Sequence, residues 1–191
     1  MLYKALSFLT SELNDYFSRT YQLTEDRAVL SAHVNADGTS ATGIVNKVSV
    51  SLVNLAPEAT VRNLPPERVG NGELRMSPAI KLNLWVLFAA SFGDYDESLK
   101  FLSSTLTFFQ SRPVFTAQNS PRLDRSFDRL VLELETMNYH ELSNLWGIVG
   151  SKYMPSAVYK VRLVTIQGGA VLDRSPGVSG LGINSTPLTP S

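Results

Sequence analysis

The residues best suited to acid–base or metal chemistry are few in this chain of 191 residues. His33 and His140 are the only histidines, and neither has a cluster of carboxylates near it in the sequence, so no metal site is predicted. The acidic run Asp94–Glu97 is better explained as a helix start, where carboxylates cap the backbone and compensate the helix dipole. The chain has no cysteine, which excludes disulfides, thiolate zinc ligands and cysteine nucleophiles.

Nucleophile and phosphate motifs are absent or misplaced. No G-x-S-x-G motif marks a serine as a nucleophile, although serines are too plentiful for counting alone to exclude a Ser–His–Asp triad. Gly147–Lys152 superficially resembles a phosphate loop. Its glycines end a predicted helix and its lysine precedes a predicted strand, which is the wrong order for phosphate binding. We therefore predict no catalytic residue, no cofactor and no enzymatic activity.

Charged side chains instead alternate along the predicted strands. Glu133 and Glu135 share one strand face, whereas Lys81, Lys160 and Arg162 occupy the solvent-like faces of other strands. Opposite charges on adjacent strands attract each other by a fraction of a kcal/mol per pair, so we predict cross-strand ion pairs. A subunit interface is the alternative use of the same charges, where they would set register more than affinity.

The composition argues against two classes of partner. Seventeen basic and seventeen acidic residues give formal neutrality, whereas a protein that binds nucleic acid needs a net basic surface. No apolar run approaches the roughly 20 residues that a membrane-spanning helix needs. The apolar stripe of the first helix, Leu2–Phe17, is flanked by Lys4 almost alone, so we expect it in the core and not on a membrane surface. The opening residues lack the pattern of a signal peptide, and cytoplasmic synthesis is expected.

Hydrophobic periodicity predicts an α+β fold, with a single mixed, mainly antiparallel sheet packed by about three helices. The predicted helices are Leu2–Phe17, Asp94–Arg112 and Asn138–Gly150. The predicted strands are Ala28–Asn35, Val45–Leu55, Ile80–Phe88, Leu130–Thr136 and Ala157–Thr165. Asp37–Gly38 is a strong turn signal, so the first two strands are expected to pair antiparallel. Asn138 and Glu141 have capping-box spacing, Gly150 stands where a helix ends, and Val114–Asp128 is predicted as a loop.

Two polar segments depart from this pattern. Pro57–Pro78 is rich in proline and carries three arginines, and we interpret it as an arm; a surface loop without a role is the alternative. From Gln167 the composition shifts to glycine, proline, serine and threonine, which predicts an extended or flexible tail over residues 167–191, after one domain of residues 1–166. The predicted partner contacts are the arginines of the arm and the isolated apolar residues of the tail: Arg62, Arg68, Arg75, Val171, Leu172, Leu181 and Ile183.

Three stretches of the sequence resemble one known family. They are Lys81–Pro121, Leu130–Gly147 and Lys152–Ile166. They are similar to the tail-terminator, or cap, proteins of extracellular contractile injection systems of the antifeeding-prophage and virulence-cassette type. The similarity runs from the first helix to about Ile166, and the arm and the tail look variable. The family has no catalytic residues to carry over.

The resemblance implies a structural protein, similar in role to the tail terminators of contractile phages. Such a protein would form a hexameric ring at the distal end of a particle, bind the last ring of inner tube protein and the last layer of sheath protein, and so fix the length. It would be assembled in the cytoplasm and become part of a released, extracellular, phage tail-like particle, with neither nucleic acid nor membrane as a partner. From the residues alone, a non-enzymatic peptide- or ligand-binding adaptor module stays open as the alternative.

Overall fold

The computed structural model of the protein describes residues 1–58, 74–76, 81–165 and 171–174. The chain divides into a larger unit, Met1–Val61 with Ala79–Ile166, and a smaller one, Arg62–Pro78 with Gln167–Ser191. The elements of the larger unit are α1 (Leu2–Tyr21), β1 (Ala28–Leu30), the 3₁₀ turn η1 (Thr42–Ile44), β2 (Lys47–Pro57), β4 (Lys81–Ser91), α2 (Tyr95–Ser111), β5 (Val114–Thr116), β6 (Phe127–Leu134), α3 (Tyr139–Val149) and β7 (Ser156–Thr165). The smaller unit contains β3 (Leu74–Met76) and β8 (Val171–Arg174).

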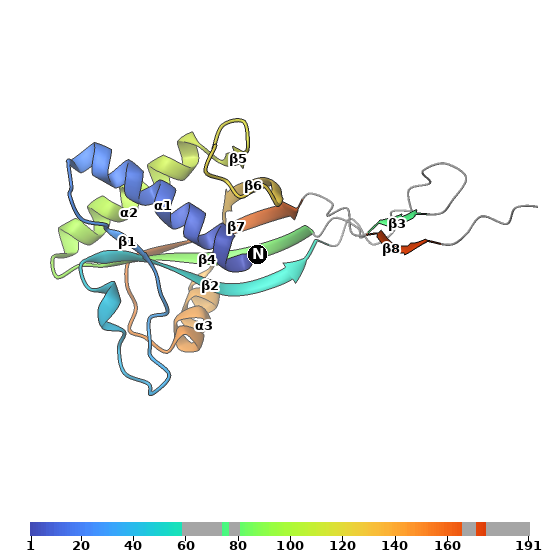
Figure 1. Ribbon diagram of the computed structural model, residues 1–191. Coiled ribbons are helices and arrows are strands. Elements are labelled where there is room, and N and C mark those ends of the chain that lie inside the picture. The colour runs from blue at the N-terminus through green and yellow to red at the C-terminus, as the bar shows by residue number, and fades with distance from the viewer. Residues whose placement is uncertain (59–73, 77–80, 166–170, 175–191) are drawn as a thin grey trace, which may run out of the picture. The chain divides into compact units, whose positions relative to one another are not determined.

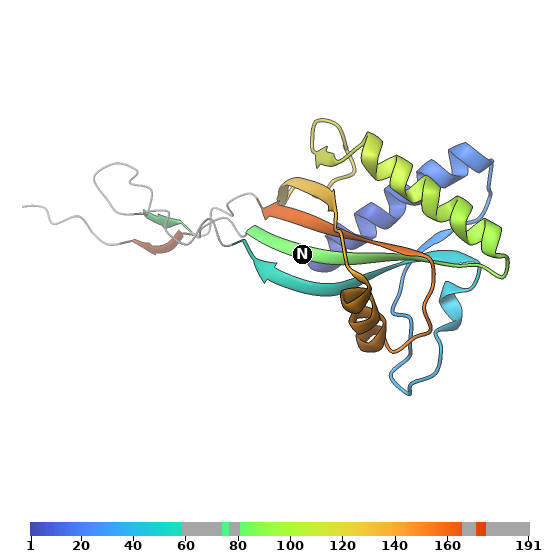
Figure 2. The same cartoon turned by 180° about the vertical axis from the view of Figure 1, so that it is seen from behind.

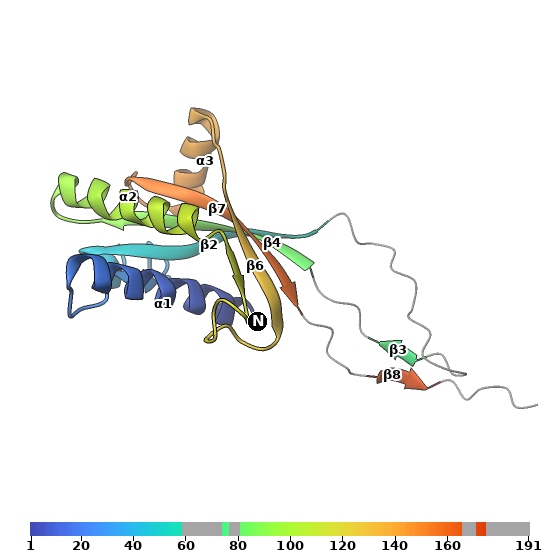
Figure 3. The same ribbon diagram turned by 90° about the horizontal axis from the view of Figure 1, so that it is seen from above.

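The larger unit is built on a six-stranded sheet in the order β1-β2-β4-β7-β6-β5. The β1–β2 pair is parallel, and the other neighbouring pairs are antiparallel. The predicted α+β class with a mixed, mainly antiparallel sheet is thus confirmed. Helices α1 and α2 cover one face of the sheet, and α3 lies on the other (Figure 1). Seen from above, α1 and α2 run side by side along the sheet (Figure 3).

The predicted antiparallel pairing of the first two strands is wrong. Asp37–Gly38 does form a turn: Gly38 has φ +81°, and the backbone N–H of Asn35 bonds to the carbonyl of Thr39 at 2.8 Å. This turn closes a small hairpin outside the sheet, where Val34 pairs with Ser40. The chain then passes through η1 before β2 begins, so that β2 runs parallel to β1. The turn signal was correct, but it says nothing about which strands flank the turn.

Strand β5 lies inside the segment predicted as a loop. It pairs antiparallel with β6, with Phe115 opposite Leu130. Three residues are too few to show an alternating pattern, and β5 is recognised as a strand only through its partner. Strand β6 itself begins at Phe127, earlier than predicted.

Aromatic rings fill the space between the first face of the sheet and its two helices. Phe17 of α1 lies edge-on to Phe101 of α2, with ring centroids 5.1 Å apart. Tyr16 of α1 stacks on Phe108 of α2 at 5.0 Å. Each such ring buries roughly 150–250 Å² of surface, so these contacts dominate the core. The buried residues of α1 are Ala5, Leu6, Phe8, Leu9, Thr10, Glu12, Leu13 and Phe17. The apolar stripe predicted for this helix is therefore core, as expected.

Helix α3 covers part of the second face, and its ends match the prediction. The side chain of Asn138 accepts hydrogen bonds from the backbone N–H groups of His140 and Glu141 at 2.9 and 3.0 Å. The Glu141 carboxylate accepts from the Asn138 N–H at 2.9 Å, which completes the capping box. Gly150 ends the helix with φ +72°, a conformation that glycine adopts without steric cost. The buried cluster beneath α3 consists of Leu87, Ala89, Leu145, Trp146 and Val158.

The segment of residues 31–46 lies on the same side of the sheet as α3 (Figure 2). The side chain of His33 connects this segment to β2 and to α3. The side chain is 3% exposed, and its Nε2 lies 2.8 Å from the Ser49 hydroxyl. Ser49 donates its only proton to the carbonyl of Ala89 at 3.1 Å, so His33 must be the donor to Ser49. The imidazole also lies edge-on to Trp146, with centroids 5.7 Å apart. Burial lowers the pKa of His33, which favours the neutral ring.

We therefore expect the free energy of unfolding to fall as the pH is lowered from 7.5 to 5.5. A histidine with a lowered pKa in the folded state binds more protons when unfolded, so stability is lost as pH falls through the ordinary pKa of about 6.5. Urea unfolding at the two pH values measures this loss.

The variant His33→Gln should abolish most of this pH dependence, because glutamine can still donate to Ser49 but does not titrate. His140→Gln, at an exposed helix position, is the matched control and should keep it. An unchanged slope in the His33 variant would contradict the assignment.

Candidate interaction surfaces

Three of the predicted contact residues lie in a small two-stranded ribbon. Arg75 is in β3, and Val171 and Leu172 are in β8. These strands pair antiparallel, with Leu74 opposite Arg174, Arg75 opposite Asp173 and Met76 opposite Val171. The segments predicted separately as arm and tail thus share one ribbon. The other predicted contacts, Arg62, Arg68, Leu181 and Ile183, lie outside the described residues.

Sequence reasoning missed this pairing because both strands are very short. The available signal was weak: Leu74 and Met76 alternate with Arg75, and Val171 comes two residues after the Gly168–Gly169 pair. Strands of three or four residues in proline- and glycine-rich surroundings cannot be distinguished from loops by periodicity. Their pairing depends on a contact between positions about 100 residues apart, which no local pattern encodes.

The part of the second sheet face not covered by α3 carries the charged strand residues. Arg162 of β7 lies 3.6 Å from Glu133 of β6 and 3.3 Å from Glu58, which confirms the predicted cross-strand ion pairing for Glu133. Lys160 lies opposite Glu133 in the register, and its ammonium group is 6.0 Å from the centroid of the Trp85 ring. Such half-exposed pairs contribute little to stability, but they are suited to setting register at a protein interface.

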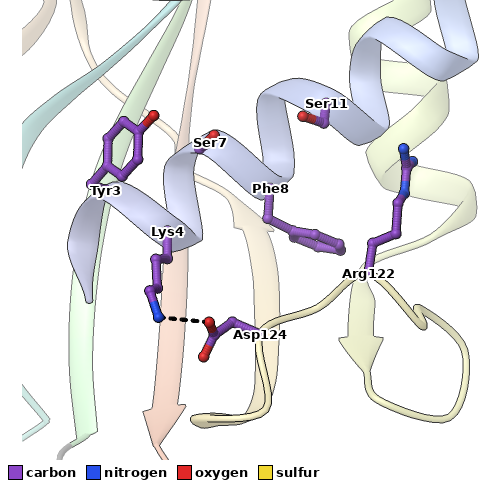
Figure 4. Close-up of a pocket in the computed structure, with 7 residues that line it drawn as sticks. All are labelled: Tyr3, Lys4, Ser7, Phe8, Ser11, Arg122 and Asp124. Carbon is purple, nitrogen blue, oxygen red and sulfur yellow. Dashed lines mark hydrogen bonds and ion pairs between the residues drawn. The ribbon is translucent and has the colours of Figure 1, made fainter.

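A pocket of about 290 Å³ opens between the start of α1 and the loop that joins β5 to β6 (Figure 4). Its lining residues are Tyr3, Lys4, Ser7, Phe8, Ser11, Arg122 and Asp124. Lys4 donates to the Asp124 carboxylate at 2.7 Å. This bond and those from Ser126 hold the pKa of Asp124 well below its usual range. Both cations of the pocket are paired with carboxylates, so the pocket is not an anion site.

Beside this pocket a buried carboxylate holds two guanidinium groups. Glu12 of α1 is 7% exposed. It accepts from Arg112 at 2.8 Å and from Arg122 at 2.9 Å, and Arg122 also pairs with the more exposed Asp15. These hydrogen bonds raise the pKa of Arg122. The cluster joins α1 to the end of α2 and to the β5–β6 loop.

A larger and mainly apolar hollow, of about 480 Å³, lies between α2 and strands β6 and β7. Its walls include Leu106, Phe109, Leu132 and Leu134, and Tyr159 contributes a phenol. Burial raises the pKa of Tyr159 to about 12, so the phenol is neutral across the physiological pH range. A hollow of this kind suits an apolar side chain.

The one serine–histidine pair described above is not a catalytic arrangement. Ser49 is fully buried, and its hydroxyl proton is already donated to a backbone carbonyl. Among the described residues no group of three or more histidine, aspartate or glutamate side chains is arranged to hold a metal ion. In the same part of the chain, no helix has both the length and the apolar character needed to cross a membrane.

Comparisons with known proteins show which family this chain is part of. Residues 5–180 match the family model described as the Pvc16 N-terminal domain. The chain belongs to this family. The resemblance inferred from the sequence is therefore confirmed, and the match extends over β3 and β8 as well as the sheet unit. Comparison with curated protein sequences gives no match.

Two solved structures share the fold at low sequence identity. One is the sheath/tube terminator, in the extended state, of PVC, an extracellular contractile injection system, with a TM-score of 0.54, 14% identity, and coverage of 96% of this chain and 63% of that chain. The other is the tube-terminating cap of the anti-feeding prophage, with a TM-score of 0.50, 12% identity, and coverage of 94% of this chain and 59% of that one. The chain thus spans about three fifths of the length of each.

We expect Glu12→Gln to destabilise the fold by about 2 kcal/mol, because it removes the charge that holds two guanidinium groups next to the core. The estimate is below that for a fully buried ion pair, since both arginines retain access to water. Chemical denaturation measures the effect. Asp15→Asn, at the exposed end of the same cluster, is the control and should cost less than about 1 kcal/mol. Equal losses in the two variants would contradict a special role for Glu12.

Proposed function

We propose that the chain is a structural terminator, which closes the distal end of a contractile injection particle by binding the last tube ring and the last sheath layer. The observation that carries this proposal is the family match over residues 5–180. The similar fold of a sheath/tube terminator and of a tube-terminating cap supports it.

The physical task of such a protein explains why no reactive site is needed. A helical stack is held by heterologous interfaces, which repeat without closing and leave an unsatisfied surface at the end. A terminator must match that surface and offer no equivalent surface to a further layer. Binding of this kind needs complementary shape and charge, and the half-exposed ion pairs around Arg162 are suited to it. The role is therefore proposed as non-enzymatic.

A ring of copies, hexameric as the resemblance implies, is the proposed assembly. A closed ring presents the same contact surface to every subunit of the tube ring beneath it. Formal neutrality of the chain leaves little electrostatic repulsion between copies. The proposed site of assembly is the cytoplasm, followed by incorporation into a released extracellular particle, with neither nucleic acid nor membrane as a partner.

The β3–β8 ribbon is the proposed point of contact with a neighbouring protein. A two-stranded ribbon is at best marginally stable alone, and a third strand from a partner would satisfy an open edge. The predicted contact residues Arg75, Val171 and Leu172 belong to this ribbon. Arg62, Arg68, Leu181 and Ile183 remain predicted contacts in the segments that flank it.

A peptide-binding adaptor is the second candidate, and the apolar hollow beside Tyr159 favours it. Size-exclusion chromatography with light scattering separates the two functions. A terminator should form a ring in solution or on addition of its tube protein, whereas an adaptor should stay at the mass of its free state in both conditions.

The central test is electron microscopy of particles assembled without this chain. The proposal predicts tubes of variable length, because nothing closes the growing end. Restoring the chain should restore a uniform length. Tubes of normal and uniform length in its absence would contradict the proposed function.

Deletion of Gln167–Ser191 tests the ribbon contact and should give particles with uncapped ends or incomplete sheaths. The matched control is deletion of Leu181–Ser191, which keeps β8 and removes two of the predicted contacts. Capping retained only by the shorter deletion would assign the contact to the ribbon. Particles of normal length and sheath occupancy from the longer deletion would exclude the tail as the contact.

A further inference from the structure

The outer edge of β5 is a lateral edge of the six-stranded sheet, where a further strand would be added. The carbonyl of Pro113 accepts from Leu132 of β6, so the backbone groups of residues 113 and 115 face β6. Val114 and Thr116 therefore direct their N–H and C=O groups away from the sheet. An exposed row of such groups is a template for pairing with another chain.

The side-chain amide of Asn119 binds to the outward backbone groups of this edge. The Thr116 N–H donates to Oδ1 of Asn119 at 2.9 Å, and Nδ2 of Asn119 donates to the carbonyl of Val114 at 2.9 Å. The amide thus makes the two bonds that one residue of a parallel neighbouring strand would make. The backbone N–H of Ser120 donates a hydrogen bond to the Thr116 carbonyl at 2.9 Å. Of the four outward groups on Val114 and Thr116, three are therefore bound within the loop.

The loop that carries Asn119 is held by the buried carboxylate of the core. Arg112 donates through Nη1 to Glu12 at 2.8 Å and through Nη2 to the Ser120 hydroxyl at 2.8 Å. The same Nη2 contacts the Asn119 carbonyl. Arg112 thus fixes the position of the Asn119 amide relative to α1 and to the end of α2. The amide therefore covers the β5 edge because the core holds it there, and not because a surface side chain happens to lie there.

The other side of the sheet shows a similar arrangement. β1 pairs only with Val48–Val50, and β2 continues past it to Pro57. The Leu55 N–H is bound by the side chain of the neighbouring Asn54 at 2.8 Å. A register shift between Leu52 and Asn54 marks a bulge in the pairing of β2 with β4, and Pro57 has no N–H to donate. Bulges and prolines are recognised means of protecting edge strands.

We infer that Asn119 closes the β5 edge of the sheet against strand addition, by taking the hydrogen bonds that an extended segment of a second copy of this chain would otherwise take. Asn54, the bulge and Pro57 protect the β2 edge by the same principle. The inference does not depend on the proposed function. For a terminator it would add that strand exchange with neighbours is confined to places other than these two edges.

The test is Asn119→Ala in the full chain, with Gln118→Ala as the matched control in the same exposed loop. Hydrogen–deuterium exchange of the peptide that contains Thr116 should be about fivefold to tenfold faster in the Asn119 variant, because one hydrogen bond is lost. Light scattering over a concentration series should show mass beyond that of the parent protein. The Gln118 variant should match the parent in both measurements.

Asn119→Asp separates edge exposure from loop disorder. Its carboxylate can still accept from Thr116 but cannot donate to Val114, and a charge at an edge opposes pairing. It should keep the exchange rate and the mass of the parent. Two results would overturn the inference. One is faster exchange in Asn119→Ala without an increase in mass. The other is equal self-association of Asn119→Ala and Asn119→Asp. Thermal unfolding of all three confirms that each is folded.

Discussion

The buried carboxylate of Glu12 is the constraint on which the larger unit depends. An unpaired charge in this position would cost several kcal/mol, so the surrounding structure has to supply cations. Two arginines meet this requirement, Arg112 where α2 ends and Arg122 in the β5–β6 loop. Since Glu12 is part of α1, this cluster fixes three segments that are distant in the sequence. The aromatic layer between α1 and α2 could form with several small changes in helix orientation, whereas charged hydrogen bonds near 2.8 Å select one.

The second face of the sheet is organised by weaker and more local contacts. Its helix, α3, is specified by its own ends, a capping box at Asn138 and a left-handed glycine at Gly150. His33 then joins the 31–46 segment to this layer through Ser49 and Trp146. The rest of this face carries the ion pairs around Arg162. Because these pairs are partly exposed, they contribute little to stability and are better suited to recognition of another protein. The first face is thus covered by two helices, whereas the second is covered in part and keeps an accessible area of charged side chains.

The sequence predicted those features that local patterns encode. The ends of α3 were predicted because Asn138, Glu141 and Gly150 cap the helix through contacts with nearby residues. The central strand β4 was predicted because both of its faces show a clear alternating pattern. The parallel direction of β1 was missed, since a turn signal does not reveal that the hairpin lies outside the sheet. β5 and the β3–β8 ribbon were missed because strands of three or four residues are defined by distant partners. The Glu12 cluster was missed for the same reason: its members lie about 100 residues apart.

The same cluster links the stability of the fold to what the fold can bind. Arg112 connects Glu12 to the loop that carries Asn119, so the force that orders the core also positions the amide that covers β5. Strand addition at the β5 edge is opposed in this way, which leaves contacts with neighbouring proteins to the faces, the pockets or the separate β3–β8 ribbon. This is the division that a closing subunit requires. Growth by repetition needs an edge that matches itself, and termination needs a surface that matches only the layer before it.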